Sequence, residues 1–280
     1  MIRTESFELQ IKKDDSIVGD VKYSTNFEGL LPVVIITHGF TGHKDWGFLP
    51  YFSEKLAQNG FLTITYNFST DLVDPIRDWF IDVDKFSTFT ISQEVNELAI
   101  LVENICQKSI FSEDTASKVD TSTLYLVGQS LGGAVSMIFS AKFNKAEKIV
   151  LLGTVGTLFR YTERQVELWK KEGIWSFSNT RTGQPLKLSV SYYYDLIENN
   201  YKLENFLSNI RVPVLFIHGR EDLTVPLKEI ENLIQLSKNP FVELKVIEKT
   251  GHTFGVEHPF SHSTEPLELV IKETINFLRL

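Results

Sequence analysis

Apolar runs and amphipathic stretches alternate along most of this chain. Runs in which apolar residues predominate predict strands, typically ones buried in a sheet, and they fall at residues 32–37, 61–66, 124–127, 148–152, 212–218 and 241–247. Between them, apolar residues that recur every three or four positions predict helices over residues 48–58, 92–108, 131–139, 227–236 and 267–280. This alternation predicts an α/β fold with a mostly parallel, doubly wound sheet.

Three stretches depart from the alternation of strand and helix. Near the N-terminus, Phe7, Leu9 and Ile11 alternate with polar residues and Ile17 and Val21 resume after a turn, so we expect an antiparallel edge hairpin and an eight-stranded sheet in total. Residues 67–88, which are rich in Asp and include Pro75, are expected to form a surface loop with short helical pieces. Residues 111–122 are expected to form a polar connection.

A long stretch in the second half of the chain interrupts the pattern, which resumes only at residue 212. A structureless connection of this size is improbable inside a compact domain. We therefore expect residues 154–209 to form a lid inserted into a single domain that spans residues 1–280. Most of its many aromatic residues are expected to form the core of the lid, and a minority to line a substrate pocket. The candidates for the pocket are Trp169, Trp175 and Tyr192, together with His43.

Composition and charge narrow the classes of partner. The net charge is −8, from 28 basic and 36 acidic residues, and there is no long basic run, so neither nucleic acid nor a membrane surface is an expected partner. The first residues lack the apolar core of a signal peptide, and no window is apolar enough to span a membrane. Cys106 is the only cysteine, which excludes an intrachain disulfide. We expect a cytoplasmic protein, and the sequence makes no prediction of its oligomeric state.

The stretch Gly128-Gln129-Ser130-Leu131-Gly132 directly follows the apolar run at residues 124–127. It matches the pattern G-x-S-x-G, in which a serine on a tight strand-to-helix turn projects its hydroxyl above the sheet. Larger side chains in place of the two glycines would collide with neighbouring backbone. Such matches also arise by chance, but the predicted strand before it and helix after it are the context that the pattern requires. Ser130 is therefore a candidate nucleophile at a helix N-terminus, where backbone N–H groups favour negative charge.

A serine nucleophile needs a histidine base and an acid that orients the histidine. His252 follows the last predicted strand, and Asp222 lies in the turn after the strand at residues 212–218. Because parallel strands end at the same edge of a sheet, both are expected beside Ser130. Glu221 competes with Asp222 for the role of the acid. We prefer Asp222, and we expect Glu221 to be a solvated surface charge.

His38, His258 and His262 are not expected to be catalytic, although the loop that begins at His38 is expected to contribute to the site. The segment His38-Gly39-Phe40-Thr41-Gly42 leaves a predicted central strand, where backbone N–H groups of a loop suit the second half of an oxyanion hole. His38 itself is expected to be a packing residue. His258 and His262 have H-x-x-x-H spacing, but Pro259 between them disfavours a helix, so we expect neither a metal site nor a cofactor.

The loop after His38, the turn around Ser130, the turn that carries Asp222, and His252 together resemble the α/β-hydrolase superfamily over nearly the whole chain. The resemblance implies that the backbone N–H groups of Phe40 and Leu131 form the oxyanion hole. More narrowly, residues 38–46 and the lid look like those of the bacterial cinnamoyl and feruloyl esterases and the serine aminopeptidase-like group.

These residues predict a serine carboxylesterase that forms an acyl-enzyme at Ser130. The aromatic content of the lid predicts small to medium esters with apolar or aromatic acyl groups as substrates. Peptidases or amidases, thioesterases and acyltransferases use the same residues and are alternatives within the enzymes. A non-catalytic binding protein on the same scaffold is the alternative of another class, although such a protein has no need of Ser130, Asp222 and His252 together.

Overall fold

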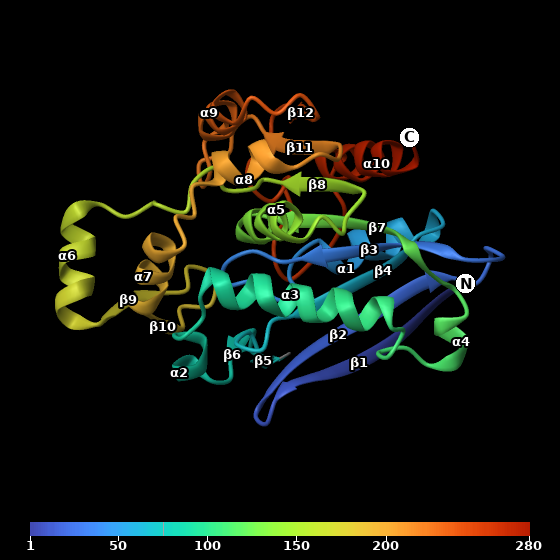
Figure 1. Ribbon diagram of the computed structural model, residues 1–280, viewed down its shortest axis with the longest axis horizontal. Coiled ribbons are helices and arrows are strands. Elements are labelled where there is room, and N and C mark those ends of the chain that lie inside the picture. The colour runs from blue at the N-terminus through green and yellow to red at the C-terminus, as the bar shows by residue number, and fades with distance from the viewer. Residues whose placement is uncertain (75) are drawn as a thin grey trace.

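The centre of the computed structural model, which describes residues 1–74 and 76–280, is an eight-stranded sheet (Figure 1). Its strands are, in spatial order, β1 (Ile2–Lys12), β2 (Asp15–Ser24), β4 (Leu62–Asn67), β3 (Leu31–Thr37), β7 (Val119–Gln129), β8 (Lys148–Leu152), β11 (Val214–Gly219) and β12 (Val242–Ile247). The hairpin β1–β2 is antiparallel, β2 pairs antiparallel with β4, and all neighbours from β4 to β12 are parallel. The expected fold class is therefore confirmed.

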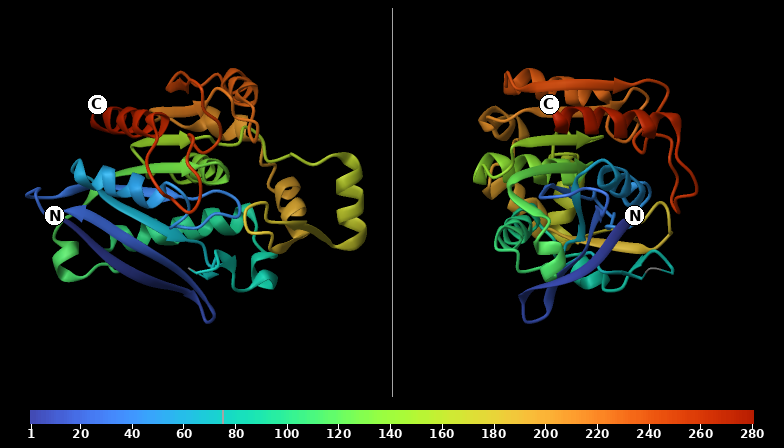
Figure 2. Two further views of the ribbon diagram at one scale, coloured as in Figure 1. Left: turned by 180° about the vertical axis from the view of Figure 1, so that it is seen from behind. Right: turned by 90° about the vertical axis from the view of Figure 1, so that its right-hand side faces the viewer.

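Helices cover both faces of this sheet (Figures 1 and 2). One face packs against α1 (Leu49–Gln58) and α10 (Glu265–Arg279), and the other against α3 (Ile91–Cys106), α5 (Leu131–Phe143), α8 (Leu203–Asn209) and α9 (Leu227–Ser237). Because successive strand residues point to opposite faces, Ile35 lies in one core and Ile36 in the other. Cover on both faces explains why central strands such as β3 and β8 are almost wholly apolar.

The segment expected to be a surface loop, residues 67–88, is partly buried, so that prediction is wrong in this respect. It forms β5 (Val73–Asp74), β6 (Trp79–Phe80) and α2 (Val83–Phe86), while Pro75 lies outside the described residues. Phe68 is 1% exposed, and the rings of Phe80 and Phe86 lie 4.3 Å apart. The sequence showed no period because each aromatic residue packs from an irregular backbone. The connection at residues 111–122 contains α4 (Glu113–Ala116) and the start of β7.

Between β8 and β11 the chain forms α6 (Glu163–Glu172), the paired strands β9 (Ile174–Ser178) and β10 (Pro185–Ser189), α7 (Ser191–Glu198) and then α8. Figure 1 shows α6, β9, β10 and α7 beyond the carboxyl ends of the parallel strands, whereas α8 returns to pack against α5 and α9. Within the part of the chain that the structure describes, no helix combines the length and the apolar composition needed to cross a bilayer.

Candidate active site

Ser130 stands alone between the end of β7 and the start of α5. Its φ of 54° and ψ of −119° are strained for a residue with a side chain, and its N–H is held by the Leu152 carbonyl at 2.9 Å. A Cβ on Gly128 would lie 2.4 Å from the Gly132 carbonyl oxygen, and a Cβ on Gly132 would lie 2.3 Å from the carbonyl oxygen of His38. The turn that exposes Ser130 therefore closes only with glycine at both positions, as the sequence suggested.

Ser130, His252 and Asp222 form a continuous hydrogen-bonded line. His252 Nε2 lies 3.0 Å from Ser130 Oγ, and His252 Nδ1 lies 2.8 Å from Asp222 Oδ2. The other carboxylate oxygen, Oδ1, accepts the backbone N–H groups of Thr224 and Val225 at 2.9 and 2.8 Å. These bonds fix the carboxylate in the turn after β11. The structure thus brings together the three residues predicted as catalytic.

The electrostatics of Asp222 suit the role of the acid. Burial alone would raise the pKa of Asp222, but the hydrogen bond and charge of His252 and the N–H of Val225 outweigh it, and the pKa lies below its ordinary value of 3.8. An Asp222 anion at neutral pH accepts a hydrogen bond from the N–H at His252 Nδ1, which holds the proton on Nδ1 and leaves Nε2 free to accept the Ser130 proton. Glu221 is exposed, as expected of a surface charge.

The loop after β3 passes close to the nucleophile. A Cβ on Gly39 would lie 2.8 Å from Ser130 Cβ, and Phe40 and Leu131 line the same cavity as Ser130. Leu131 is the first residue of α5, and the first N–H groups of a helix have no carbonyl partner within it. His38 is 3% exposed, and burial lowers its pKa to about 4, so it stays neutral behind the loop. This arrangement is compatible with an oxyanion hole from Phe40 and Leu131.

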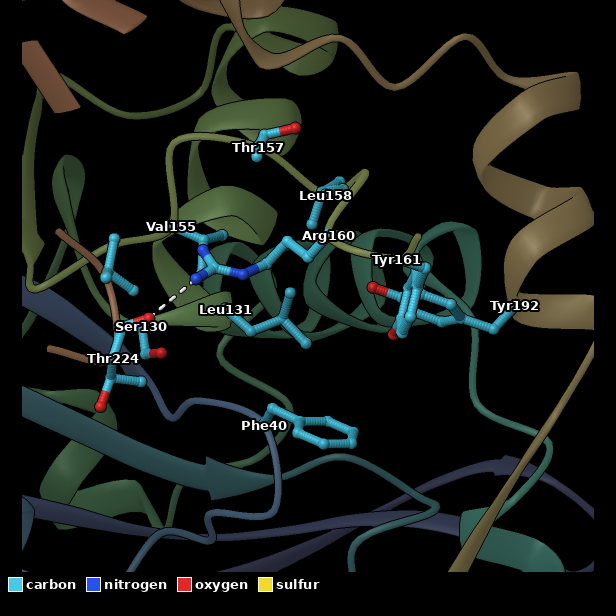
Figure 3. A pocket seen from close by; sticks show the side chains of 11 residues that line it. Phe40, Ser130, Leu131, Val155, Thr157, Leu158, Arg160, Tyr161, Tyr192 and Thr224 are labelled. Atoms are coloured by element: carbon cyan, nitrogen blue, oxygen red, sulfur yellow. Dashed lines mark hydrogen bonds between the residues drawn. The ribbon is translucent and has the colours of Figure 1, made fainter. Parts of the chain in front are cut away.

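A cavity of about 170 Å³ opens directly above Ser130 (Figure 3). Apolar and aromatic side chains dominate its lining, which consists of Phe40, Ser130, Leu131, Val155, Thr157, Leu158, Arg160, Tyr161, Tyr192, Thr224 and Val225. Figure 3 shows Tyr161 and Tyr192 on the side away from Ser130. The volume is close to the ~150 Å³ of an engineered cavity in another protein that takes up benzene. The cavity therefore suits a group of about the size of one ring.

Of the four residues predicted to bind substrate, Tyr192 lines this cavity, whereas His43, Trp169 and Trp175 do not belong to its described lining. Trp169 donates its Nε1–H to the Leu188 carbonyl at 2.9 Å, and its ring lies 5.6 Å from that of Trp175. Both tryptophans thus belong to the core of the inserted segment, and their assignment to the pocket is corrected. His43 is paired with Asp78 instead.

Several pocket residues that follow β8 were not predicted from the sequence, among them Val155, Leu158, Arg160 and Tyr161. Arg160 is the charged residue of the described lining, and its guanidinium donates to Glu229 Oε1 and to the Thr224 carbonyl, each at 2.7 Å. A usable signal existed, because β8 ends at the same edge of the sheet as the strands before Ser130 and Asp222. That position alone would have predicted the residues after β8 to lie near the site.

The sheet order, the tight turn at Ser130 and the position of the site at the strand ends define the α/β-hydrolase fold. Est1E from Butyrivibrio proteoclasticus, whose structure with ferulic acid bound is also known, has a TM-score of 0.68 at 20% identity over 98% of this chain and 97% of Est1E. The α/β hydrolase GrgF from Penicillium sp. sh18 has a TM-score of 0.72 at 15% identity over 100% and 98%. At these identities the likeness confirms the fold.

No family model matches the chain. Among curated proteins, the 2-hydroxy-6-oxo-2,4-heptadienoate hydrolase of Pseudomonas putida F1 is 29% identical over 168 residues, which cover 47% of this chain and 58% of that enzyme. The match thus spans less than two thirds of that relative. The expected resemblance to α/β hydrolases is confirmed at the level of the fold, and the activity is argued from the site itself.

Proposed function

We propose that the chain is a serine hydrolase, and within that class a carboxylesterase. The observation that carries the proposal is the line from Ser130 Oγ through His252 to Asp222, with distances of 3.0 and 2.8 Å, at a strained turn beneath a cavity. Perturbed or strained groups that gather in one cleft are typical of catalytic sites. A binding protein gains nothing from this strain.

The geometry supports a two-step reaction. Ser130 Oγ attacks the ester carbonyl carbon while His252 Nε2 takes up the hydroxyl proton, and the N–H groups of Phe40 and Leu131 hold the oxygen that becomes negative. The intermediate collapses as His252 hands its proton to the departing alcohol, which leaves an acyl group on Ser130. Water, deprotonated by the same histidine, then attacks the acyl carbon. The bond to Ser130 Oγ breaks as His252 returns the proton to that oxygen, and the acid is released. The chemistry of these residues requires no metal or cofactor.

The size and lining of the cavity support acyl groups that are apolar or aromatic and about one ring wide. We infer that residues 154–209 act as a lid on the single domain, because Leu158, Arg160, Tyr161 and Tyr192 of this segment line the cavity and Figure 3 shows Tyr161 and Tyr192 on the side away from Ser130. Amides, thioesters and acyl transfer to an acceptor other than water use the same groups and are decided by substrate trials.

Labelling with a fluorophosphonate tests the nucleophile without knowledge of the substrate. We expect one adduct per chain on Ser130, located by peptide mass spectrometry, and none on Ser130→Ala. Ser136 is a matched control, since its hydroxyl is buried in α5 and donates to the Gly132 carbonyl at 2.8 Å, so Ser136→Ala should label like the wild type. Folded protein that takes no label would favour the binding-protein alternative.

A further inference from the structure

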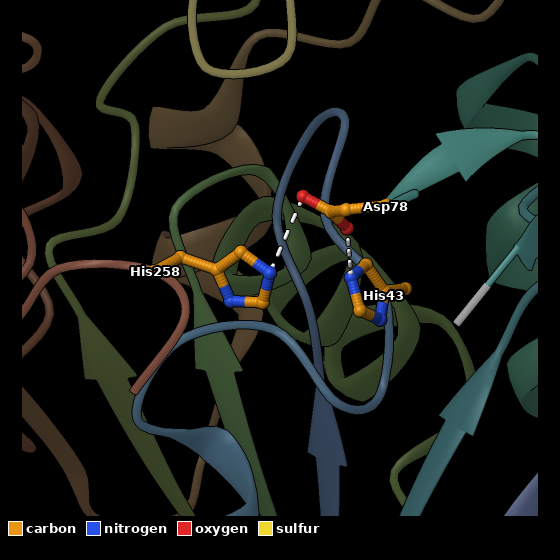
Figure 4. A group of neighbouring side chains, drawn as sticks. All are labelled: His43, Asp78 and His258. Carbon is orange, nitrogen blue, oxygen red and sulfur yellow. Dashed lines mark hydrogen bonds and ion pairs between the residues drawn. The ribbon is translucent and has the colours of Figure 1, made fainter. Parts of the chain in front are cut away.

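Asp78, in the turn between β5 and β6, meets three side chains from three other segments, and Figure 4 shows two of them, His43 and His258. His43 Nε2 lies 2.6 Å from Asp78 Oδ1, while His258 Nε2 and Arg181 Nη2 lie 3.3 and 3.5 Å from Asp78 Oδ2. Arg181 also donates to the Thr41 carbonyl at 3.0 Å. We call Asp78, His43, His258 and Arg181 the clasp. No member of the clasp belongs to the described lining of the cavity above Ser130.

The partners of Asp78 lie on segments that carry the reacting groups. His43 follows Phe40 in the loop between β3 and α1, and His258 follows His252 in the segment between β12 and α10. Arg181 lies in the turn between β9 and β10 of the inserted segment. A single carboxylate thus joins the loop of the oxyanion hole, the loop of the base and the lid.

The hydrogen-bond directions show where the protons of the clasp lie. The N–H of Gly47 donates to His258 Nδ1 at 2.8 Å, and the N–H of Asp45 donates to His43 Nδ1 at 3.3 Å. A ring nitrogen that accepts a hydrogen bond carries no proton, so each neutral ring bears its proton on Nε2, which faces Asp78. Burial lowers the pKa of both histidines against the opposing effect of Asp78, which keeps them neutral near pH 7.

These directions favour a hydrogen-bonded clasp over a metal site. The donor atoms of His43, Asp78 and His258 lie within 4.8 Å of one another, close enough to hold an ion. A metal at Nε2 requires the lone pair there and a proton on Nδ1, which would point at the N–H groups of Gly47 and Asp45. The Arg181 guanidinium beside Asp78 adds a further positive charge.

We propose that Asp78 is a positioning residue for the reaction at Ser130, an inference that rests on the proposed function. Asp78 accepts the Nε2–H of His43 at 2.6 Å and lies 3.3 Å from His258 Nε2, and through these two contacts it fixes the loops that bear Phe40 and His252 relative to each other. Oxyanion donors act only within about 2.7–3.1 Å of the oxygen, and a displacement of about 1 Å costs on the order of a hundredfold in rate. Asp78 takes no part in substrate binding, which occurs in the cavity above Ser130.

The test compares Asp78→Asn with Asp74→Asn. Asp74 lies on the same hairpin, but its Oδ1 accepts the N–H groups of Ile76 and Arg77, a role that asparagine retains. Asparagine at position 78 places an amide opposite two N–H donors and removes the charge. We expect Asp78→Asn to lower kcat roughly ten- to hundredfold with KM changed by less than about threefold, the signature of an interaction made in the transition state. Asp74→Asn should stay near the wild type.

The fluorophosphonate labelling rate of Ser130 should fall with kcat in Asp78→Asn, measured well below the melting temperature of each variant. If the wild type is labelled and Asp78→Asn has the same labelling rate and the same kcat as the wild type, the proposed role of the clasp is wrong. The proposed hydrolase function would still stand. A wild type that takes no label would instead overturn the proposed function. An equal loss in Asp74→Asn would assign the effect to the hairpin fold. Loss of wild-type activity in EDTA with recovery in Zn²⁺ would replace the clasp by a metal site.

Discussion

At the scale of single residues, three carboxyl side chains are buried close to one another on the side of the sheet near His38. Asp71, Glu94 and Glu97 are each 4–5% exposed, and Asp71 Oδ2 lies 3.5 Å from His38 Nε2. Burial, reinforced by the mutual repulsion of these groups, raises the pKa of Asp71 and Glu94 well above their ordinary values. Folding at neutral pH therefore requires Asp71 and Glu94 to take up protons or to bury charge.

The sign of this effect predicts how Glu94→Gln changes stability. Unfolded Glu94 ionises above about pH 4.5 while the folded form holds its proton, so the folded state binds more protons and stability falls as pH rises from there. Glutamine has no carboxyl group to ionise, so Glu94→Gln removes the free-energy cost of keeping this side chain protonated or buried as an anion. We expect its free energy of unfolding to exceed that of the wild type by on the order of 1 kcal/mol at pH 8, with a smaller difference at pH 5. Urea denaturation at pH 5 and pH 8 measures the free energy of unfolding of both proteins. The prediction is contradicted if the stability gained by Glu94→Gln over the wild type is smaller at pH 8 than at pH 5.

The positions of residues after predicted strands indicated which side chains gather at the candidate site, but not which side chains hold the surrounding loops in place. Ser130, Asp222 and His252 were predictable because each follows a strand with the same direction, and the edge of a parallel sheet collects them. The pairing of His43 with Asp78 was not predictable, because it joins two irregular segments whose sequences carry no period. Trp169 and Tyr192 have the same aromatic character, and only the packing of the inserted segment decides that Tyr192 faces the cavity.

At the scale of elements, α9 anchors the entry to the inserted segment. Glu229 Oε1 accepts the N–H groups of Gly156 and Thr157 at 2.7 and 3.2 Å, as well as the Arg160 guanidinium. Arg160 in turn holds the carbonyl of Thr224 in the turn that carries Asp222. One carboxylate thus sets the position of the pocket wall that follows β8.

Glu229→Ala should loosen this wall. We expect KM for a preferred ester to rise roughly five- to tenfold, which corresponds to about 1 kcal/mol of lost binding, with a lower melting temperature. Glu231→Ala on the same helix is the control, since Glu231 makes an exposed pair with Lys228, which contributes little. An unchanged KM in Glu229→Ala, with only the melting temperature lowered, would show that the tie supports the fold and not the pocket.

The elements themselves follow from the sequence where burial is regular. Strands such as β3 and β8 were found because two helical layers leave them no polar face, and α3 was found because one stripe of it meets the sheet. The segment with β5, β6 and α2 was taken for a surface loop, since its phenylalanines enter the core one at a time. A periodic pattern of apolar residues indicates a helix or strand with one buried face. Residues that are buried from an irregular backbone produce no such pattern.

At the scale of the whole molecule, the sheet and the inserted segment each supply part of the cavity. Phe40 and Leu131 come from the strand ends, whereas Tyr161 and Tyr192 come from the segment between β8 and β11. We expect the two parts to have different roles. The residues at the strand ends carry out the reaction, and the inserted segment determines which acyl groups fit.

Tyr192→Ala tests the selection. Removal of the ring should enlarge the cavity and shift preference toward bulkier acyl groups, with kcat/KM for a one-ring acyl ester lowered about tenfold by the loss of ring contacts. Trp175→Ala is the comparison, because Trp175 packs in the same segment outside the described cavity lining. The idea fails if the two variants change the order of substrate preference equally.

The measurement that tests the central claim most directly is hydrolysis of p-nitrophenyl esters of increasing acyl length, beside methyl ferulate and an aminoacyl amide, by the wild type and by Ser130→Ala. The account predicts turnover of the esters, strongest for apolar or aromatic acyl groups of about one ring, and a loss of at least about a thousandfold in Ser130→Ala. Ester hydrolysis that survives in Ser130→Ala would contradict the account. Turnover of the amide alone would move the protein to the peptidases.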